Sequence, residues 1–369
     1  MLERILLCAG YRVGLYTSPH LIDYNERVRI DGVPVAGAAL CAAFARVEAA
    51  RGATPLTYFE FGTLAAWVAF AEAGVDVLIL EVGLGGRLDA VNAFDADCAV
   101  IASIDLDHME FLGETREAIG FEKAGIFRAG RPAIVGDAQP PHSLLEYAAS
   151  IGADLQVLGR DFGYLTEPGQ WTWWGRRGRR GGLAHPALRG AIQLANASTA
   201  ISALDALAAR LPVSMQDIRR GLSEVELPGR FQVLPGRPTL VLDVAHNPQA
   251  AGVLADNLGC MAFHPETWGV FGMLADKDAA GVAARLKGRV DHWLLADLPG
   301  PRGMCAEALA RVLADQGLTV EGCFASPAEC YRAARERAGE DDRIAAFGSF
   351  LTVAGVLQAI SDERKRSTT

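Results

Sequence analysis

The chain has 369 residues, of which 50% are hydrophobic and 21% are charged. This composition is too apolar and too moderately charged for a disordered protein. At about 150 residues per domain, the length predicts two domains. The formal net charge of −9 excludes a global positive field of the kind that holds nucleic acid. Lysine is scarce, since the 35 basic residues include only Lys123, Lys277, Lys287 and Lys365.

Cysteine usage and hydropathy predict a cytoplasmic protein. The 7 cysteines are scattered and form no CxxC pair, so we expect reduced core thiols rather than disulfides or a zinc site. The opening MLERILLCAGYR carries charge inside its apolar stretch, which is not typical of a secretory signal. No uncharged apolar run reaches the roughly 20 residues that a membrane-spanning helix needs.

The first part of the chain opens with a helix that ends near Gly10 and then alternates apolar runs with alanine-rich helical segments. Strands buried on both faces are predicted at Arg12–Thr17, Asp76–Val82, Asp97–Ser103 and Pro132–Gly136. Helices are predicted at Val35–Ala50, Phe61–Ala73 and Pro141–Ile151. This order indicates an α/β domain with a mostly parallel sheet, although the strand that normally precedes the first helix is missing. Residues 155–185 interrupt the pattern before a helix at Asn196–Leu211.

A second and more regular unit follows the Pro-Gly motifs at 228–229 and 235–236. Strands are predicted at 239–244, 267–272, 291–297 and 343–349, with 321–324 as a further short candidate, and helices separate them. We therefore expect residues 1–231 to form the first domain and residues 232–369 to form a smaller, doubly wound, Rossmann-like domain. Ligand sites in such sheets lie beyond the carboxyl ends of the strands.

Polar residues follow three strands of the first domain. Glu81 ends a buried strand and leads into a glycine-rich turn, Ser18 follows another strand, and His108 follows a third. A carboxylate at the end of an apolar strand is costly to bury without a metal ion or a cationic partner. Each signal alone also has a structural interpretation, because a glycine-rich turn lets helix and strand approach closely and an isolated histidine is often only hydrogen-bonded.

Lys123 stands out because this chain uses arginine wherever a general positive charge serves. One interpretation is a salt bridge to a carboxylate on its own helix. The other is chemistry that arginine cannot perform, since a buried lysine can lose its proton and react at nitrogen. Reaction with carbon dioxide would give a carbamate, an oxygen-bearing anion suited to magnesium. Hydroxyl, carboxylate, imidazole and modified lysine together resemble a magnesium–phosphate site.

Two further segments have competing interpretations. Asp243 and His246 lie beyond a strand of the second domain, where they either contact a nucleotide and its transferring phosphate or belong to an Asx turn with a helix cap at Asn247. The segment from Trp171 to Arg180 combines three tryptophans with four arginines, as a nucleic-acid patch does. In an acidic chain without further basic segments nearby, a solvated hairpin is favoured.

An ordered series of motifs closely resembles the bacterial folylpolyglutamate synthase/dihydrofolate synthase family, from Leu2 to about Ile360. The series comprises AGYRVGLYTSPHL (9–21), YNERVRIDG (24–32), LTYFEFGTLAA (56–66), ILEVGLGGRLDAVN (79–92), DHMEFLG (107–113), EKAGIFR (122–128), PGRFQV (228–233), DVAHNP (243–248), GMLADKD (272–278) and GSF (348–350). The resemblance implies an ATP-dependent amide ligase of the muramyl-ligase superfamily with a P-loop-type first domain. In this family ATP phosphorylates the folate carboxylate, and the amine of L-glutamate attacks the acyl phosphate.

The resemblance also implies roles for individual residues. Ser18, Glu81 and His108 match the magnesium ligands, and Lys123 matches a carbamylated lysine. The other matches are nucleotide-binding positions (Asn196, Arg230, Asp243), a position near the γ-phosphate (His246) and positions near the pteroate site (Thr57, Arg87, Asp89). The implied cofactors are ATP and Mg²⁺, and the implied substrates are dihydropteroate or a reduced folate and L-glutamate. We expect a monomer without nucleic-acid or membrane partners.

One family motif has no match. Members carry GTNGKG[ST] before the helix that opens this chain, whereas none of the four lysines here follows a glycine. Such a loop needs Gly-Lys-Ser/Thr, because its backbone N–H groups cradle phosphates while the lysine and hydroxyl reach oxygens and magnesium. We therefore expect the 369-residue polypeptide to be inactive or nearly so. The alternatives are a muramyl-type amino-acid ligase, which usually has an extra N-terminal domain, and a degenerate folate-binding module without catalysis.

Overall fold

The computed structural model describes residues 1–106, 108–190 and 192–368, which form two compact units. Unit 1 consists of residues up to Ala187 and of Ile192–Val225. Unit 2 begins at Glu226 and also includes the short stretch before Ile192. Arg230 therefore belongs to the same unit as Asp243. No helix within the described residues is both long and apolar enough to cross a membrane.

Unit 1 contains eight α-helices, two 3-10 helices and ten strands among its described residues. The α-helices are α1 (Leu2–Cys8), α2 (Gly37–Arg51), α3 (Tyr58–Ala73), α4 (Met109–Leu112), α5 (Arg116–Ala124), α6 (His142–Ile151), α7 (Ile192–Ala206) and α8 (Met215–Glu224). The 3-10 helices are η1 (Tyr24–Arg27) and η2 (Ala90–Ala93). The strands are β1 (Val13–Tyr16), β2 (Val28–Ile30), β3 (Val33–Pro34), β4 (Val77–Leu80), β5 (Ala99–Ile101), β6 (Pro132–Val135), β7 (Asp154–Val157), β8 (Gly163–Glu167), β9 (Gln170–Gly175) and β10 (Gly178–Leu183).

The strands of unit 1 form three sheets rather than the one mostly parallel sheet that the sequence predicts. The first sheet has the order β3-β2-β1-β4, with β1 parallel to β4 and antiparallel to β2. The second sheet, β5-β6-β7, is wholly parallel. The third, β10-β9-β8, is an antiparallel meander built by residues 163–183. The α/β fold is thus confirmed, with its parallel strands divided between two sheets.

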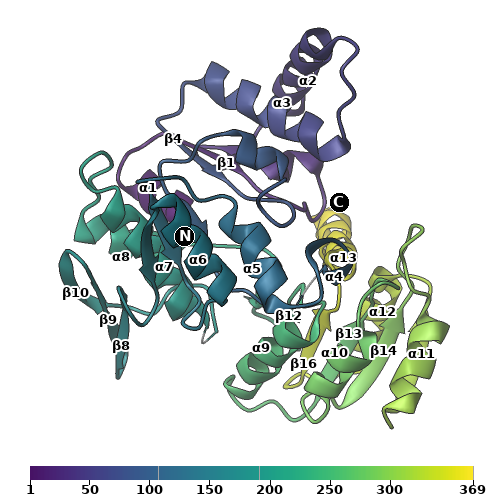
Figure 1. The fold of residues 1–369 in the computed structure, drawn as a ribbon. Helices are drawn as coiled ribbons and strands as arrows, with labels where there is room; N and C mark the ends of the chain where they lie inside the picture. Colours follow the sequence, from purple (N-terminus) through teal and green to yellow (C-terminus); the bar gives the residue numbers. More distant parts are fainter. Residues whose placement is uncertain (107, 191, 369) are drawn as a thin grey trace. The chain divides into compact units, whose positions relative to one another are not determined.

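Helices cover both faces of the two parallel sheets. Helices α2 and α3 lie side by side on one face of the β1–β4 sheet (Figure 1), and α1 packs on the other. In the second sheet, α5 and α6 share a core with β5 and β6, while α7 contacts both strands. This two-sided burial explains why the parallel strands are almost continuously apolar in sequence.

The antiparallel meander is anchored by two tryptophans of β9. Trp171 is fully buried and Trp173 is 1% exposed, and both belong to the core that α1, α7 and α8 line. Their indole N–H groups donate to the carbonyl of Ala184 at 3.0 Å and to the hydroxyl of Ser202 at 3.1 Å. The meander is therefore tied into the core by one face, rather than being a hairpin solvated on both faces.

Unit 2 is a doubly wound domain, as predicted. Its strands are β11 (Gln232–Leu234), β12 (Thr239–Leu242), β13 (Thr267–Phe271), β14 (His292–Ala296), β15 (Val320–Phe324) and β16 (Arg343–Phe347). They form one sheet of order β11-β12-β16-β13-β14-β15, parallel except for β11. The helices are α9 (Pro248–Gly259), α10 (Ala279–Leu286), α11 (Ala306–Asp315), α12 (Pro327–Arg337) and α13 (Phe350–Thr368). Helices α9 to α11 share the main core on one face, and α12 contacts β13 and β14.

Candidate active site

A cavity of about 150 Å³ lies beyond the carboxyl ends of β4 and β5 in unit 1. One wall is the glycine-rich loop that follows β4, and the other walls come from the segment after β5 and from α4 and α5. The lining residues are Val82, Gly83, Leu84, Gly85, Asp105, His108, Leu112, Ile119 and Lys123. The structure therefore brings His108 and Lys123, which are 15 residues apart in sequence, to one cavity at the edge where ligand sites of α/β sheets lie.

Glu81 and Ser18 lie together at the start of this loop. The backbone N–H of Ser18 donates to Oε2 of Glu81 at 3.0 Å, and the N–H of Glu81 donates to the carbonyl of Tyr16 at 2.9 Å. The parallel pairing of β1 with β4 produces this meeting, because Tyr16 and Leu80 are register partners and the next residues follow at the same edge. Glu81 directly precedes the cavity-lining Val82.

The glycine-rich loop is closed by Asp89. Its Oδ2 accepts hydrogen bonds from the N–H groups of Gly83 at 3.1 Å and Leu84 at 3.0 Å, and its Oδ1 accepts one from Val91 at 2.9 Å. Asp89 therefore caps η2 and fixes the loop at the same time. These contacts are structural, in addition to the substrate role that the resemblance implies.

At two positions of the loop, the backbone conformation or a close neighbour requires glycine. Gly85 has a φ of +69°, in the left-handed region, and a Cβ there would lie 2.8 Å from the side chain of Leu112. A Cβ on Gly86 would lie 2.8 Å from the carbonyl oxygen of Glu122. The loop thus packs closely on α5, which carries Lys123 in its last turn.

Arg87 joins the loop to α5. Its N–H donates to the carbonyl of Glu122 at 2.8 Å, and its guanidinium pairs with the Glu122 carboxylate at 2.9 Å. The hydrogen bond to Glu122 raises the pKa of Arg87. The guanidinium also lies 5.8 Å from the ring centre of Phe121. Among the described residues, Glu122 is therefore the carboxylate that forms the ion pair with Arg87.

His108 has an unusual backbone. Its φ of +51° places it in the left-handed region, which is uncommon for residues other than glycine. It stands at the N-terminus of α4, where the N–H groups of Phe111 and Leu112 donate to its carbonyl. Such conformations cost about 1–3 kcal/mol and cluster at functional sites.

A buried arginine next to Ser18 was not predicted from the sequence. Arg27 is 9% exposed, and the N–H of Thr17 donates to its carbonyl at 2.9 Å. Its guanidinium lies beside the rings of Tyr24 and Tyr58, 5.4 and 5.5 Å from their centres, and its Nε donates to Nδ1 of His20 at 2.9 Å. Burial and the nearby Arg27 lower the pKa of His20, which suits a neutral imidazole that accepts this bond.

Two residues near the site were not predicted, Asp105 and Arg27, and the sequence contains a signal for only one of them. Asp105, which lines the cavity, directly follows the predicted third strand and could have been chosen on the same grounds as His108. Arg27 has no comparable local signal, because its burial results from three aromatic or imidazole side chains that the tertiary fold gathers. Asp107 lies outside the described residues.

The candidate residues of unit 2 form a separate group around Asp243. Its Oδ2 accepts from the N–H of Phe231 and its Oδ1 from the N–H of Ala245, both at 2.8 Å. Phe231 has a φ of +43° and a side chain that is only 5% exposed. Burial raises the pKa of Asp243, and its two backbone hydrogen bonds oppose that rise. The carboxylate, which follows β12, therefore holds the PGRF segment (228–231) before β11 in a strained conformation.

His246, Asn247 and Arg230 complete this group. Nδ1 of His246 lies 2.9 Å from the carbonyl oxygen of Val244, and Oδ1 of Asn247 accepts the N–H of Ala250 at 2.9 Å, capping α9. Arg230 is exposed and lies 5.3 Å from the ring centre of Phe350, whose centroid is 6.4 Å from that of His246. The helix cap at Asn247 is therefore present, and it leaves a nucleotide role for Asp243 and His246 open.

Two predicted residues make mainly local contacts. The Nδ2 of Asn196 donates to Oε1 of Gln193 on the same helix at 3.2 Å. Thr57 caps α3 through a capping box, in which its Oγ1 accepts the N–H of Glu60 and its own N–H donates to Glu60. Thr57 thus stabilises the N-terminus of α3, and Asn196 contacts its own helix. Neither residue lines the cavity that contains Lys123.

The side chains around the cavity suit a divalent cation by their chemistry. They supply carboxylate, hydroxyl and imidazole donors, and Mg²⁺ prefers oxygen ligands from one or two carboxylates together with water and phosphate. Among the described residues, no three His, Cys, Asp or Glu side chains converge as a complete metal cage. An ion here would therefore depend on Ser18, on a modified Lys123 or on ligands from its substrate.

Comparisons with known protein families agree with this arrangement. Residues 38–149 match the family described as Mur ligase middle domain, and residues 229–350 match that described as Mur ligase, glutamate ligase domain. The first match contains Glu81, His108 and Lys123, and the second contains Arg230, Asp243 and His246.

Similar proteins cover nearly the whole chain. The dihydrofolate synthase/folylpolyglutamate synthase of Escherichia coli K12 is 45% identical over 98% of this chain and 83% of its own length. The structure of E. coli FolC in complex with DHPP and ADP has a TM-score of 0.93 at 45% identity, covering 98% of this chain and 85% of that one. The Yersinia pestis bifunctional enzyme with AMPPNP and Mn has a TM-score of 0.91 at 46% identity, with 98% and 85% coverage. The chain therefore belongs to the bifunctional dihydrofolate synthase/folylpolyglutamate synthase family.

Proposed function

We propose that this chain is an ATP-dependent ligase that joins L-glutamate through an amide bond to dihydropteroate or to a folylpolyglutamate. The observation that carries the proposal is 45% identity over 98% of the chain with a dihydrofolate synthase/folylpolyglutamate synthase. The convergence of His108, Lys123 and the loop after Glu81 at one cavity supports it independently.

In the proposed reaction the substrate carboxylate is phosphorylated by ATP, and the glutamate amine then displaces the phosphate from the acyl carbon. A bound Mg²⁺ would disperse the charge of the transferring phosphoryl group. Ser18, Glu81 and His108 are proposed to hold the metal. Lys123, as a carbamate, would supply a further oxygen ligand from α5, whose backbone packs closely on the glycine-rich loop.

The remaining residues are assigned to substrate and nucleotide. Arg87 and Asp89 shape the loop beside the cavity, and Thr57 is proposed to lie near the pteroate. In unit 2, Asp243 orders the segment that contains Arg230, and both are proposed as nucleotide-binding residues. Asn196 of unit 1 is also proposed as a nucleotide-binding residue. His246, at the N-terminus of α9, is proposed to approach the γ-phosphate, where the helix dipole also favours negative charge.

The proposal is tested by adding ATP, Mg²⁺ and L-glutamate to the purified chain with either dihydropteroate or tetrahydrofolate. ADP release and a product larger by one glutamyl residue are the expected signs of ligation. Binding of dihydropteroate is measured in parallel by calorimetry, so that recognition of the substrate is tested separately from turnover. Failure of both pteroate and folate to bind would overturn the proposal.

The same experiment separates the alternatives. Folate binding without any effect of ATP and Mg²⁺ would favour a non-catalytic binding module. Binding of a nucleotide-linked muramoyl acceptor in place of folate would favour a muramyl-type ligase. We further propose that the protein acts as a monomer in the cytoplasm, where its seven free cysteines stay reduced, and light scattering on a sizing column tests its mass in solution.

A further inference from the structure

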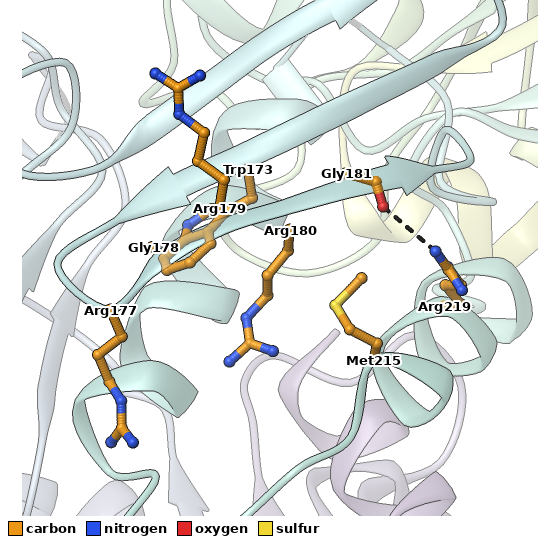
Figure 2. A pocket seen from close by; sticks show the side chains of 8 residues that line it. All are labelled: Trp173, Arg177, Gly178, Arg179, Arg180, Gly181, Met215 and Arg219. Atoms are coloured by element: carbon orange, nitrogen blue, oxygen red, sulfur yellow. Dashed lines mark hydrogen bonds between the residues drawn. The ribbon is translucent and has the colours of Figure 1, made fainter.

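A second cavity lies in unit 1, between the β9–β10 hairpin and the start of α8 (Figure 2). Its volume is about 440 Å³, within the range of small-ligand sites. It is lined by Trp173, Arg177, Gly178, Arg179, Arg180, Gly181, Met215 and Arg219. None of these residues lines the cavity that contains Lys123, and none has a role in the proposed ligase reaction.

The lining is strongly positive, although the chain as a whole carries −9. Half of the eight lining residues are arginines, and the lining contains no acidic residue. Within the described residues, only Arg180 of these four pairs with a carboxylate, that of Asp205 at 3.3 Å. Arg177, Arg179 and Arg219 thus leave about three uncompensated charges around a single cavity.

Arg180 is held in place from two sides. Its guanidinium lies 5.7 Å from the ring centre of Trp173, and Asp205, whose side chain is 6% exposed, anchors its Nη2. Its Nε is buried and has no hydrogen-bond partner within the described residues. Leaving a buried donor unpaired is unfavourable, and an ordered water or a ligand would satisfy this N–H group.

Arg219 is positioned by the hairpin itself. Its Nη2 donates to the carbonyl of Gly181 at 3.3 Å, as the dashed line in Figure 2 shows. In the same view, Arg177 and Arg180 extend to one side of the hairpin and Arg179 extends to the other. Arg177 and Arg180 therefore lie on the same side of the hairpin, and Arg179 and Arg219 add further positive charge to the lining.

Two of the three tryptophans of this segment speak against the nucleic-acid interpretation. A single-stranded nucleic acid needs exposed rings on which bases stack. Trp171 and Trp173 are at most 1% exposed, because they pack into the core. The site therefore offers charge and guanidinium N–H donors without a stacking platform.

We propose that this cavity binds a small oxyanion with two or more negative charges. Guanidinium groups form paired N–H···O bonds with phosphate and carboxylate oxygens, which gives both strength and orientation. Phosphorylated metabolites and polycarboxylates share this chemistry. The four lining arginines and the volume of about 440 Å³ fit a ligand of that size class rather than a single monovalent ion.

Calorimetry with pyrophosphate and with citrate tests the proposal on the full chain. At least one probe should bind with sub-millimolar affinity that weakens as salt is added. The double variant Arg177→Ala/Arg219→Ala should weaken binding roughly 100-fold, about tenfold for each lost ionic partner. Both side chains are exposed, so the fold should persist, and circular dichroism checks this. The tighter probe tells whether the ligand is a phosphate or a carboxylate.

Two further variants control for location. Arg332→Ala removes an exposed arginine of unit 2 and should leave binding within about twofold, because it changes net charge only. Lys123→Met should also leave it unchanged, which separates this site from the catalytic cavity. The proposal is overturned if neither probe binds below 1 mM, if the double variant binds as wild type does, or if Arg332→Ala loses as much affinity as the double variant.

Discussion

Asp89 holds the glycine-rich loop in place through hydrogen bonds to its backbone. Its two oxygens accept three backbone hydrogen bonds, two from the loop residues Gly83 and Leu84 and one from Val91. Substitution Asp89→Asn keeps the shape of the side chain but turns one oxygen into an NH₂ donor. The amide then serves either the loop or the cap of η2, and it cannot serve both.

The expected loss of unfolding free energy follows from the hydrogen bonds that each substitution removes. Asparagine caps helices about as well as aspartate, so the cap is the contact that survives. The two charge-assisted bonds to Gly83 and Leu84 are then broken. Since the two N–H groups are partly exposed and water can replace one partner, the net loss is about 1–2 kcal/mol for Asp89→Asn. For Asp89→Ala, which also removes the cap, we expect about 2–3 kcal/mol.

Scanning calorimetry of unit 1 unfolding measures this effect. In a unit of this size 1 kcal/mol corresponds to about 2–4 °C, so Asp89→Asn should lower the melting temperature by about 2–8 °C. Binding of dihydropteroate should weaken together with stability, because the same loop lines the cavity.

The matched control is Asp95→Asn. The side chain of Asp95 is 84% exposed and pairs only with Arg128 within the described residues, so its change should stay within about 0.5 kcal/mol. If both Asp89 variants melt as wild type does while pteroate binding is lost, Asp89 contacts substrate without holding the loop, and the structural reasoning is wrong.

Three further predictions concern other parts of the molecule. Wild-type protein incubated with ¹³C-bicarbonate and Mg²⁺ should show a carbamate signal in ¹³C NMR that Lys123→Arg lacks and Lys287→Arg keeps; its presence in Lys123→Arg would contradict the assignment. Asn247→Ala removes the N-cap of α9 and should cost unit 2 about 1 kcal/mol in urea unfolding, whereas an unchanged midpoint would show that the cap is dispensable. Burial opposes the charge on His292, but hydrogen bonds with Glu321 and Glu266 outweigh it and raise its pKa. Because the pKa is higher in the folded state, this stabilisation is complete below about pH 6.5 and is lost as pH rises through the folded pKa. The stability difference between wild type and His292→Gln should therefore shrink above neutral pH, and a difference that grows would refute it.

Local patterns in the sequence were sufficient for most strands and helices. The apolar runs predicted at Arg12–Thr17 and Asp76–Val82 are the strands β1 and β4, and the regular second half is the doubly wound unit 2. Strand pairing could not be predicted in the same way. Strand β1 pairs parallel with β4 and antiparallel with β2. These pairings depend on contacts between segments that are far apart in sequence.

The candidate site was predictable in its chemistry and only partly in its geometry. Residues at strand ends, such as Glu81 and His108, could be chosen because ligand sites of α/β sheets lie beyond the carboxyl ends of the strands. The burial of Arg27 beside Tyr24 and Tyr58 could not be foreseen, since Tyr58 comes from a separate element. The double use of Asp89 as loop contact and helix cap is local in sequence, but it depends on the exact path of the loop.

The length of the chain predicted two domains, its acidity argued against a global positive field, and its scarcity of lysine singled out Lys123. Periodicity and strand-end polarity determined the elements and the edge on which chemistry lies, because they are properties of a few neighbouring residues. Only the tertiary structure decided that the tryptophans of residues 171–173 serve the core while the arginines beside them surround a cavity. The two roles follow from which face of β9 packs on α1, α7 and α8. The choice of that face cannot be predicted from a few neighbouring residues.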